Sequence, residues 1–157
     1  MDESSLYRTA LLKAMSICSR REFCVSDIET RLESWGVSNS DSQKIVGTLI
    51  NENFINEERY SHAFVKDKFK YNGWGKIKIA AHLRTKRIPS DIISSALESV
   101  DNELYINTLK SLIESHRRSV KAKNSYEIKS RLLRFGLSRG FESSLLYNIL
   151  NTLDDID

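Results

Sequence analysis

The chain has 157 residues, of which 40% are hydrophobic and 29% are charged, and its formal net charge is +3. These values are typical of a folded globular protein rather than a disordered one, and no apolar run approaches the ~20 residues that a membrane-spanning helix needs. The first residues, MDESSLYRT, lack the basic start and apolar core of a signal peptide, so we expect a cytoplasmic protein.

The cysteine, proline and glycine content indicates the fold class. Cys18 and Cys24 have no partner cysteines and no nearby histidines, so we expect two reduced, buried thiols rather than a zinc site. The single proline, Pro89, and only 6 glycines leave little room for β-hairpins with tight turns. The sequence therefore predicts an all-α protein.

One apolar pattern occurs three times along the chain. It reads Ile-x3-Leu-x3-Gly-Val or a close variant, and its copies begin at Ile28, Ile79 and Ile128, so the first and third lie 100 residues apart. Self-similarity with a period of about 50 residues is typical of small units that bury their apolar faces against one another. We therefore predict an elongated, curved array of three tandem three-helix repeats, at residues 1–56, 57–101 and 102–157.

In the first repeat, the second helix is expected to begin at the capping box Ser26-x-x-Glu29 and to end at Gly36, a left-handed C′ glycine. The helices on either side carry apolar residues at the spacing of a buried helical face. These residues are Leu11, Ala14, Met15 and Cys18 in the first helix, and Ile45, Val46, Leu49 and Ile50 in the third.

The second repeat differs from the other two. Gly73-Trp74-Gly75 ends its first helix in a turn, and Trp74 either wedges between repeats or faces a partner. Arg87 stands where the other copies have glycine, so the turn there is expected to rely on Pro89, which would start the third helix. The first helix carries four aromatic residues that we expect in the core: Tyr60, Phe64, Phe69 and Tyr71.

The third repeat copies the first. Asn124, with Glu127 three residues later, is expected to cap its second helix, and Gly136 is expected to end that helix. The apolar faces of its first and third helices are predicted at Tyr105, Leu109, Leu112 and Ile113, and at Leu145, Leu146, Ile149 and Leu150.

The small net charge hides two basic segments. Residues 59–88 hold nine basic residues and one acidic residue, and residues 110–139 hold nine basic and two acidic residues, whereas the rest of the chain is acidic. Charge separated in this way favours a polyanionic partner, although lysine and arginine are also the ordinary solvent-facing residues of a helix. Aromatic residues interleaved with the first basic segment favour a binding surface there.

Motifs of enzyme chemistry are missing. The sequence has no GxxxxGK[ST] P-loop and no GxSxG nucleophile elbow. His62, His82 and His116 lie in separate predicted helices, without carboxylates or cysteines at metal-ligand spacing. We therefore expect no catalytic residues, no metal and no cofactor, and we do not expect an enzyme.

The segment from Phe54 to residue 100 resembles the RecX family. Phe54-Ile-Asn-Glu-Glu-Arg-Tyr60 is similar to the acidic–arginine–aromatic signature of that family. Gly75, Ile79, Leu83 and Lys86-Arg87-Ile88 are similar to its Gly-basic-Ile-x3-Leu-x3-Gly-Ile segment, with Arg87 in place of the second glycine. Asn56 stands where an aspartate is common. The resemblance is weaker in the flanking repeats.

The resemblance implies a regulator of the RecA recombinase. RecX-like proteins are arrays of three-helix units that engage the RecA–single-stranded DNA filament and limit its growth, which restrains ATP hydrolysis, strand exchange and the co-protease activity of the SOS response. The resemblance also implies direct binding of single-stranded DNA, with double-stranded DNA as a second candidate. We expect a monomer. An elongated array with two basic segments is suited to a helical groove, where it would touch protein and phosphate together.

Three sets of residues follow as candidates. The signature residues Glu57, Glu58, Arg59 and Tyr60 are expected to be structural, as a lock between the first and second repeats. The filament- or DNA-binding surface is expected at Lys66, Lys70, Trp74, Lys76, Lys78, Arg84, Lys86 and Arg87. A secondary basic surface is expected at Arg117, Arg118, Lys121, Lys123, Lys129, Arg131, Arg134 and Arg139.

Two other functions stay open. A stand-alone DNA-binding module of the helix-turn-helix type would bind naked DNA with a steep salt dependence and would not need RecA. A scaffold for an acidic protein would keep its DNA-related activities when the charges of the basic residues are reversed.

Overall fold

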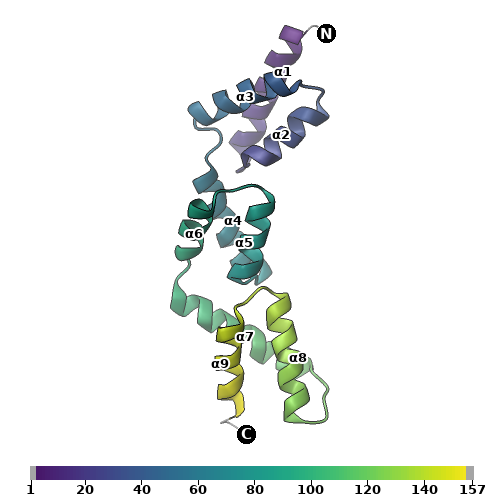
Figure 1. Cartoon of the computed structure of the whole chain (residues 1–157), viewed down its shortest axis with the longest axis vertical. Helices are drawn as coiled ribbons and strands as arrows, with labels where there is room; N and C mark the ends of the chain where they lie inside the picture. Colours follow the sequence, from purple (N-terminus) through teal and green to yellow (C-terminus); the bar gives the residue numbers. More distant parts are fainter. Residues whose placement is uncertain (1–2, 155–157) are drawn as a thin grey trace. The chain divides into compact units, whose positions relative to one another are not determined.

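The computed structural model describes residues 3–154, and all regular structure in that range is helical. The predicted all-α class is confirmed. Along residues 3–154 nine helices follow one another (Figure 1). They are α1 (Glu3–Arg20), α2 (Val25–Ser34), α3 (Asn39–Asn51), α4 (Glu57–Asn72), α5 (Lys76–Thr85), α6 (Ser90–Glu98), α7 (Asn102–Ser119), α8 (Ser125–Ser138) and α9 (Ser143–Asp154).

The helices pack into two compact units, each made of two chain segments. Unit 1 comprises Met1–Ala63 and Leu83–Ile93, and unit 2 comprises Phe64–His82 and Ser94–Asp157. The repeat boundaries at residues 56–57 and 101–102 stay a prediction. No helix in residues 3–154 is long and apolar enough to cross a membrane.

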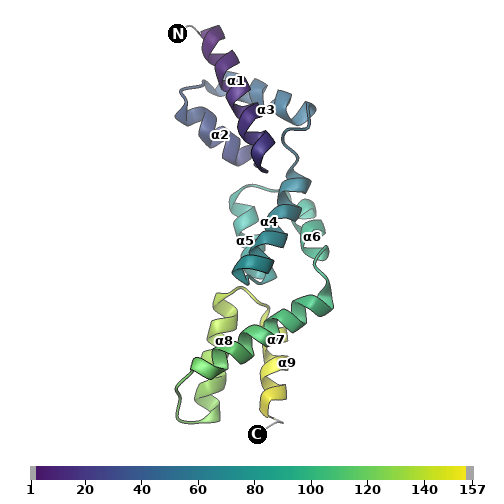
Figure 2. The ribbon, with the colours of Figure 1, turned by 180° about the vertical axis from the view of Figure 1, so that it is seen from behind.

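In unit 1, α3 packs against both α1 and α2 (Figures 1 and 2). Most of the predicted apolar positions of these helices are in its core, whereas Leu11, Met15 and Val46 are partly buried against that core and Ile50 is 48% exposed. Cys18 and Cys24 are buried, free thiols, as expected, and burial raises the pKa of Cys24 to about 11. The fully buried side chains of this core include Ala14, Ile28, Leu32, Ile45 and Leu49.

The beginning of α2 differs from the prediction. Cys24, rather than Ser26, occupies the N-cap, and its side chain makes no capping hydrogen bond. The Val25 amide instead donates to Glu57 Oε2 at 3.3 Å. The capping box at Ser26 was therefore wrong, because a carboxylate from the first turn of α4 satisfies the helix end that a local side chain would otherwise cap.

The end of α2 confirms the prediction at Gly36. Gly36 has φ +83°, its amide donates to the Glu33 carbonyl at 3.0 Å, and the Val37 amide donates to the Leu32 carbonyl at 3.0 Å. This pair of bonds is a Schellman motif. The helix therefore ends in the left-handed conformation for which glycine pays no steric cost.

The end of α5 repeats this geometry without glycine. Arg87 has φ +59°, and the amides of Arg87 and Ile88 donate to the carbonyls of Arg84 and Leu83. The expectation that this turn relies on Pro89 was therefore wrong, because the left-handed C′ conformation is kept by a residue with a side chain. Such a residue costs roughly 1–2 kcal/mol relative to glycine.

In unit 2, α8 packs against both α7 and α9 (Figures 1 and 2). Asn124 caps α8 as predicted, since its Oδ1 accepts from the Glu127 amide at 2.8 Å. The predicted end of the helix at Gly136 was wrong. Gly136 lies inside α8 and is buried, and a Cβ there would lie 2.2 Å from Leu146 Cδ2. This glycine serves close packing against α9, and the left-handed C′ position is taken one turn later by Gly140, with φ +89°.

The turn between α8 and α9 also fixes the start of α5. The Gly75 amide donates to the Arg139 carbonyl at 2.7 Å, and the Ile77 amide donates to the Gly140 carbonyl at 3.0 Å. A Cβ on Gly75 would lie 2.3 Å from the Gly140 oxygen. The backbone of Gly75 is therefore in direct contact with the backbone of the α8–α9 turn, and this contact fixes the end of the Gly73-Trp74-Gly75 segment.

Two of the four aromatic residues of α4 are buried as predicted, Tyr60 and Phe69, each 8% exposed. The ring centroids of Phe69 and Tyr105 lie 5.5 Å apart. The prediction was wrong for Tyr71, which is 74% exposed near the end of α4. Phe64 is half-buried and lies on the surface described next.

Candidate nucleic-acid interface

Five of the eight residues predicted for the binding surface belong to unit 2. Lys66 and Lys70 are exposed on α4, and Trp74, Lys76 and Lys78 are half-buried on the following turn and on α5. The other three, Arg84, Lys86 and Arg87, belong to unit 1. The predicted set thus divides between the two units.

The backbone of Trp74 is anchored to the end of α4. Its amide donates to the Lys68 carbonyl at 3.1 Å, and the preceding Gly73 amide donates to the Phe69 carbonyl at 3.2 Å. Gly73 has φ +64°, and the next residue, Gly75, is fixed by the Arg139 carbonyl. The indole is therefore presented from a turn whose backbone is already ordered.

Four side chains surround this indole, and we call the five residues the Trp74 cluster: Phe64, Lys68, Trp74, Lys78 and His82. The Phe64 ring meets the indole edge-on, at a centroid distance of 6.4 Å and an interplanar angle of 71°. His82 is tilted against it at 4.6 Å and 51°. Lys68 Nζ and Lys78 Nζ lie 5.0 Å and 4.5 Å from the indole centroid.

The Trp74 cluster is positively charged and partly open to solvent. His82 is exposed, and the other four side chains are half-buried. None of the ion pairs formed within residues 3–154 involves Lys68 or Lys78. Their ammonium groups lie over the face of an aromatic ring, and such a cation–π interaction contributes roughly 0.5–1 kcal/mol at an exposed site. An anion can therefore bind both lysines without first displacing a carboxylate.

The predicted residues of unit 1 have a different environment. Lys86 Nζ lies 2.6 Å from Asp27 Oδ1 and Arg87 Nη2 lies 3.3 Å from Glu29 Oε1. The hydrogen bond that Lys86 donates to Asp27 raises the pKa of Lys86. Both cations are thus already matched by carboxylates of α2, whereas Arg84 is exposed and takes part in none of the ion pairs formed within residues 3–154.

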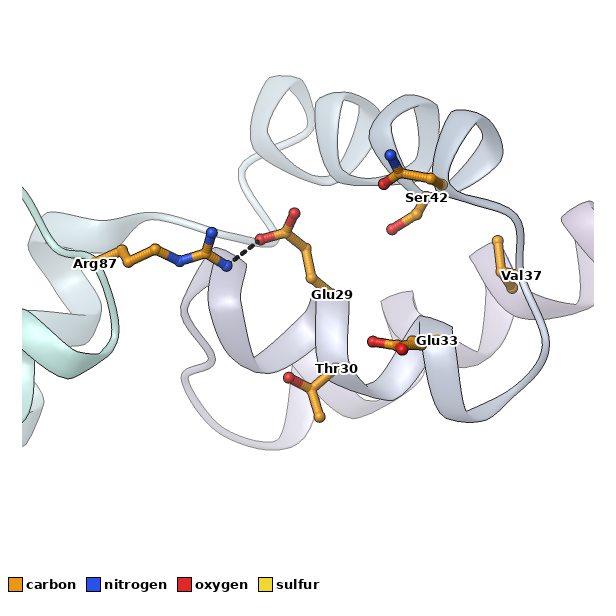
Figure 3. A pocket seen from close by; sticks show the side chains of 7 residues that line it. Glu29, Thr30, Glu33, Val37, Ser42 and Arg87 are labelled. Carbon is orange, nitrogen blue, oxygen red and sulfur yellow. Dashed lines mark hydrogen bonds and ion pairs between the residues drawn. The ribbon is translucent and has the colours of Figure 1, made fainter.

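Arg87 also borders a pocket of about 450 Å³ on unit 1 (Figure 3). Glu29 and Glu33 line the same pocket, together with Thr30, Val37, Asn39 and Ser42. Figure 3 shows the guanidinium of Arg87 reaching Glu29. Two carboxylates repel phosphate, so this pocket is unsuited to nucleic acid.

Three of the four signature residues join the first turn of α4 to the rest of unit 1. Glu57 accepts from the Val25 amide, and burial raises the pKa of its carboxyl. Arg59 Nε lies 2.5 Å from Glu22 Oε2, and its Nη2 donates to the carbonyls of Asn53 and Phe54. Tyr60 is buried, which raises the pKa of its hydroxyl, and Glu58 is exposed.

The residues predicted for the secondary basic surface lie on α7, on α8, in the loop between them and, for Arg139, at the C-cap of α8, all in unit 2. Arg131 has internal partners, Glu127 Oε1 at 2.9 Å and the Lys121 carbonyl at 3.0 Å. Arg139 donates to the Asn72 carbonyl at 2.9 Å. The exposed members are Arg118, Lys121, Lys123, Arg131 and Arg134; Arg117, Lys129 and Arg139 are half-buried.

Sequence reasoning missed three members of the Trp74 cluster. Phe64 was assigned to the core, and Lys68 and His82 were not selected. A signal was present, because Phe64 and Lys68 are spaced i, i+4 on α4, and Lys78 and His82 are spaced i, i+4 on α5. Residues at this spacing lie on one helical face, and both pairs flank the tryptophan turn.

The described residues bring no group of three or more histidine, cysteine or acidic side chains together in a way that could hold a metal ion. What the Trp74 cluster offers is a π-surface with adjacent cations. That combination suits a ligand with both bases and phosphates.

Comparison with known sequences gives consistent matches over most of the chain. Residues 56–97 match the family model described as RecX, second three-helix domain. "Regulatory protein RecX" of Lactobacillus johnsonii is 29% identical over 145 residues, which cover 92% of this chain and 54% of the relative. The protein of the same name from Clostridium perfringens (strain 13 / Type A) is 28% identical over 129 residues, 81% of this chain and 60% of the relative. The chain thus spans little more than half the length of these relatives.

Two crystal structures share the fold. That of RecX from Lactobacillus salivarius has a TM-score of 0.82 and 20% sequence identity, over 96% of this chain and 98% of that chain. Another, of regulatory protein RecX, has a TM-score of 0.86 and 20% identity, over 95% of this chain and 73% of that chain.

Proposed function

We propose, from the membership of this chain in the RecX family, that it regulates the RecA recombinase by binding the RecA–single-stranded DNA filament. The observation that carries the proposal is the match of residues 56–97 to the second RecX domain, since this segment also holds the Trp74 cluster. The name of the relatives supports a regulatory role. Inhibition of filament growth, and with it of ATP hydrolysis and strand exchange, is the form of regulation that we propose.

The charge distribution supports a partner that combines protein and phosphate. The exposed lysines of α4 and the two lysines of the Trp74 cluster, Lys68 and Lys78, take part in none of the ion pairs formed within residues 3–154. Phosphates along a nucleic-acid strand would pair with these lysines. Such binding releases counterions, so its affinity would fall markedly as the salt concentration rises. The basic residues of unit 1 are paired with α2 instead, so we assign the main contact to residues 66–78.

The first experiment measures ATP hydrolysis by RecA on single-stranded DNA while this protein is titrated far below the RecA concentration. Progressive loss of hydrolysis at substoichiometric amounts is expected, because one inhibitor on a filament affects many subunits, whereas sequestering DNA or free RecA needs near-equal amounts. Unchanged hydrolysis, together with DNA binding in the same buffer, would refute the proposal and favour a stand-alone DNA-binding module.

A matched pair of variants locates the surface. Lys66→Glu with Lys70→Glu reverses two exposed charges on α4, and Arg8→Glu with Lys44→Glu makes the same change in net charge on α1 and α3. We expect the first pair to weaken inhibition at least tenfold and the second pair to retain it. Equal inhibition by both pairs would exclude the α4 surface.

A further inference from the structure

We propose that the Trp74 cluster binds an unpaired nucleobase by stacking on the Trp74 indole, while Lys68 and Lys78 contact the phosphates on either side. This proposal deepens the function proposed above, which supplies the single strand, but the binding itself needs no RecA. The ligand class is a single-stranded nucleic acid whose bases are free to leave the helical stack.

The geometry of the aromatic side chains supports stacking. Phe64 meets the indole edge-on at 71° and supports it from the side, and His82 is tilted at 51°. The indole is thus flanked by rings without being sandwiched in parallel between them. Because Trp74 is half-buried and its turn is anchored by Lys68 and Arg139 carbonyls, little conformational entropy remains to be lost on binding.

The lysines add a reason for a nucleotide rather than an apolar ligand. Lys68 Nζ and Lys78 Nζ come from two different helices, α4 and α5, and both end within 5.0 Å of the indole centroid. Ammonium groups on long, flexible side chains can swing outward to phosphate while a base takes their place on the ring. Asp67, the single acidic residue between Arg59 and Ile88, is exposed on α4 and takes part in none of the ion pairs formed within residues 3–154, so it does not hold either lysine.

A duplex does not fit this site as well as a single strand. Stacking on a side chain requires a base that is unpaired or turned out of the helix, and every base has a π-face, so the binding is tolerant of sequence. The proposal therefore predicts a preference for single strands that comes from the base, and a salt dependence that comes from the two lysines.

The test uses tryptophan fluorescence. The chain has two tryptophans, so the variant Trp35→Phe leaves Trp74 as the single reporter. We expect oligothymidylate to quench Trp74 fluorescence, and a length-matched abasic strand, which offers phosphates without bases, to bind without quenching. Equal quenching by the abasic strand would overturn the proposal.

Affinity measurements give a second, independent readout. Trp74→Ala is expected to weaken binding of oligothymidylate about 5- to 150-fold and to leave binding of the abasic strand unchanged, whereas Trp74→Phe keeps most of the affinity. Trp35→Ala is the matched control, because Trp35 is also half-buried under a lysine, with Lys13 Nζ at 4.4 Å, and it should have no effect. Equal losses for both strands in Trp74→Ala, with helicity preserved, would show that Trp74 only positions the lysines and would overturn the stacking.

Lys68→Gln and Lys78→Gln complete the design, because each removes one ammonium charge and keeps the indole. Each is expected to lower the slope of log affinity against log salt by about 0.7, the value for one phosphate contact on a single strand. An unchanged slope in both variants would refute the phosphate contacts. Since none of these assays contains RecA, their failure would leave inhibition of RecA standing, and loss of inhibition would leave base stacking standing.

Discussion

Gly136→Ala tests whether the glycine inside α8 is required by packing. A Cβ at this position would lie 2.2 Å from Leu146 Cδ2 and 2.9 Å from Leu146 Cδ1, and Leu146 is fully buried, so relief of this contact requires its side chain to rearrange within the core. Overpacking of a core costs about 1–3 kcal/mol, and the closeness of this contact argues for the upper part of that range. The better helix propensity of alanine returns about 1 kcal/mol, so the expected net loss of stability is about 1–2 kcal/mol.

Gly47→Ala in α3 is the matched control. A Cβ there meets nothing within 4 Å, so only the gain in helix propensity remains and the variant should be more stable by about 0.5–1 kcal/mol. Thermal unfolding followed by far-UV circular dichroism measures both, at about 2–4 °C in Tm per kcal/mol for a chain of this size. The two variants should therefore shift Tm in opposite directions.

A double-mutant cycle identifies the contact. Leu146→Ala alone should cost about 2–5 kcal/mol through the cavity it leaves, and in the Gly136→Ala background it should cost at least about 1 kcal/mol less, because the new methyl group occupies part of that cavity. If Gly136→Ala stabilises the protein as Gly47→Ala does, or if the two changes simply add, the packing argument is refuted.

Three further changes test the helix ends and the buried polar contacts. Arg87→Gly should stabilise unit 1 by up to about 1 kcal/mol, since relief of the left-handed strain outweighs an exposed ion pair with Glu29; a loss of stability in chemical denaturation would contradict this. Glu57→Gln should be neutral or stabilising at neutral pH. The folded-state pKa of Glu57 is raised above its ordinary value of 4.5, so the folded state binds the proton more tightly than the unfolded state does. The free energy of unfolding therefore falls as pH rises through that pKa. The variant should lack this part of the pH dependence of unfolding. Tyr105→Phe removes the hydroxyl that donates to Glu142 and accepts from the Lys76 amide at 2.9 Å, and should cost about 1–3 kcal/mol, visible as a lower denaturation midpoint; an unchanged midpoint would mean that water replaces the hydroxyl.

The helices were predictable because their signals are local. Apolar spacing identified the buried faces of α1, α3, α7 and α9, and Asn124 identified the start of α8 from its own side chain. Glycine was harder to interpret. Gly36 and Gly136 occupy equivalent places in the repeated pattern, but one ends a helix with a positive φ and the other lies within a helix against Leu146. Sequence spacing does not distinguish a glycine needed for its φ from one needed for its small size.

The error at α2 came from a partner distant in sequence, and the error at α5 came from a left-handed conformation in a residue other than glycine. Glu57 satisfies the first turn of α2 from 32 residues away, and Arg87 keeps a glycine-like conformation beside a carboxylate of α2. The Trp74 cluster was found only in part for the same reason as at α2: Trp74 and Lys78 were selected for their residue type, whereas Phe64, Lys68 and His82 join them only when α4 and α5 are folded.

The division of the chain between the two units restricts how it can be cut. Because each unit consists of two separate stretches of sequence, the polypeptide changes unit after Ala63, after His82 and after Ile93, and each of these points lies inside a helix, α4, α5 or α6. No single cleavage releases either unit as one peptide. A protease that cleaves in loops would not cut at any of these three points, because each lies within a helix. Fragments made at the repeat boundaries would carry incomplete units, so activity recovered by mixing two such fragments would report their reassembly rather than the function of a separate module.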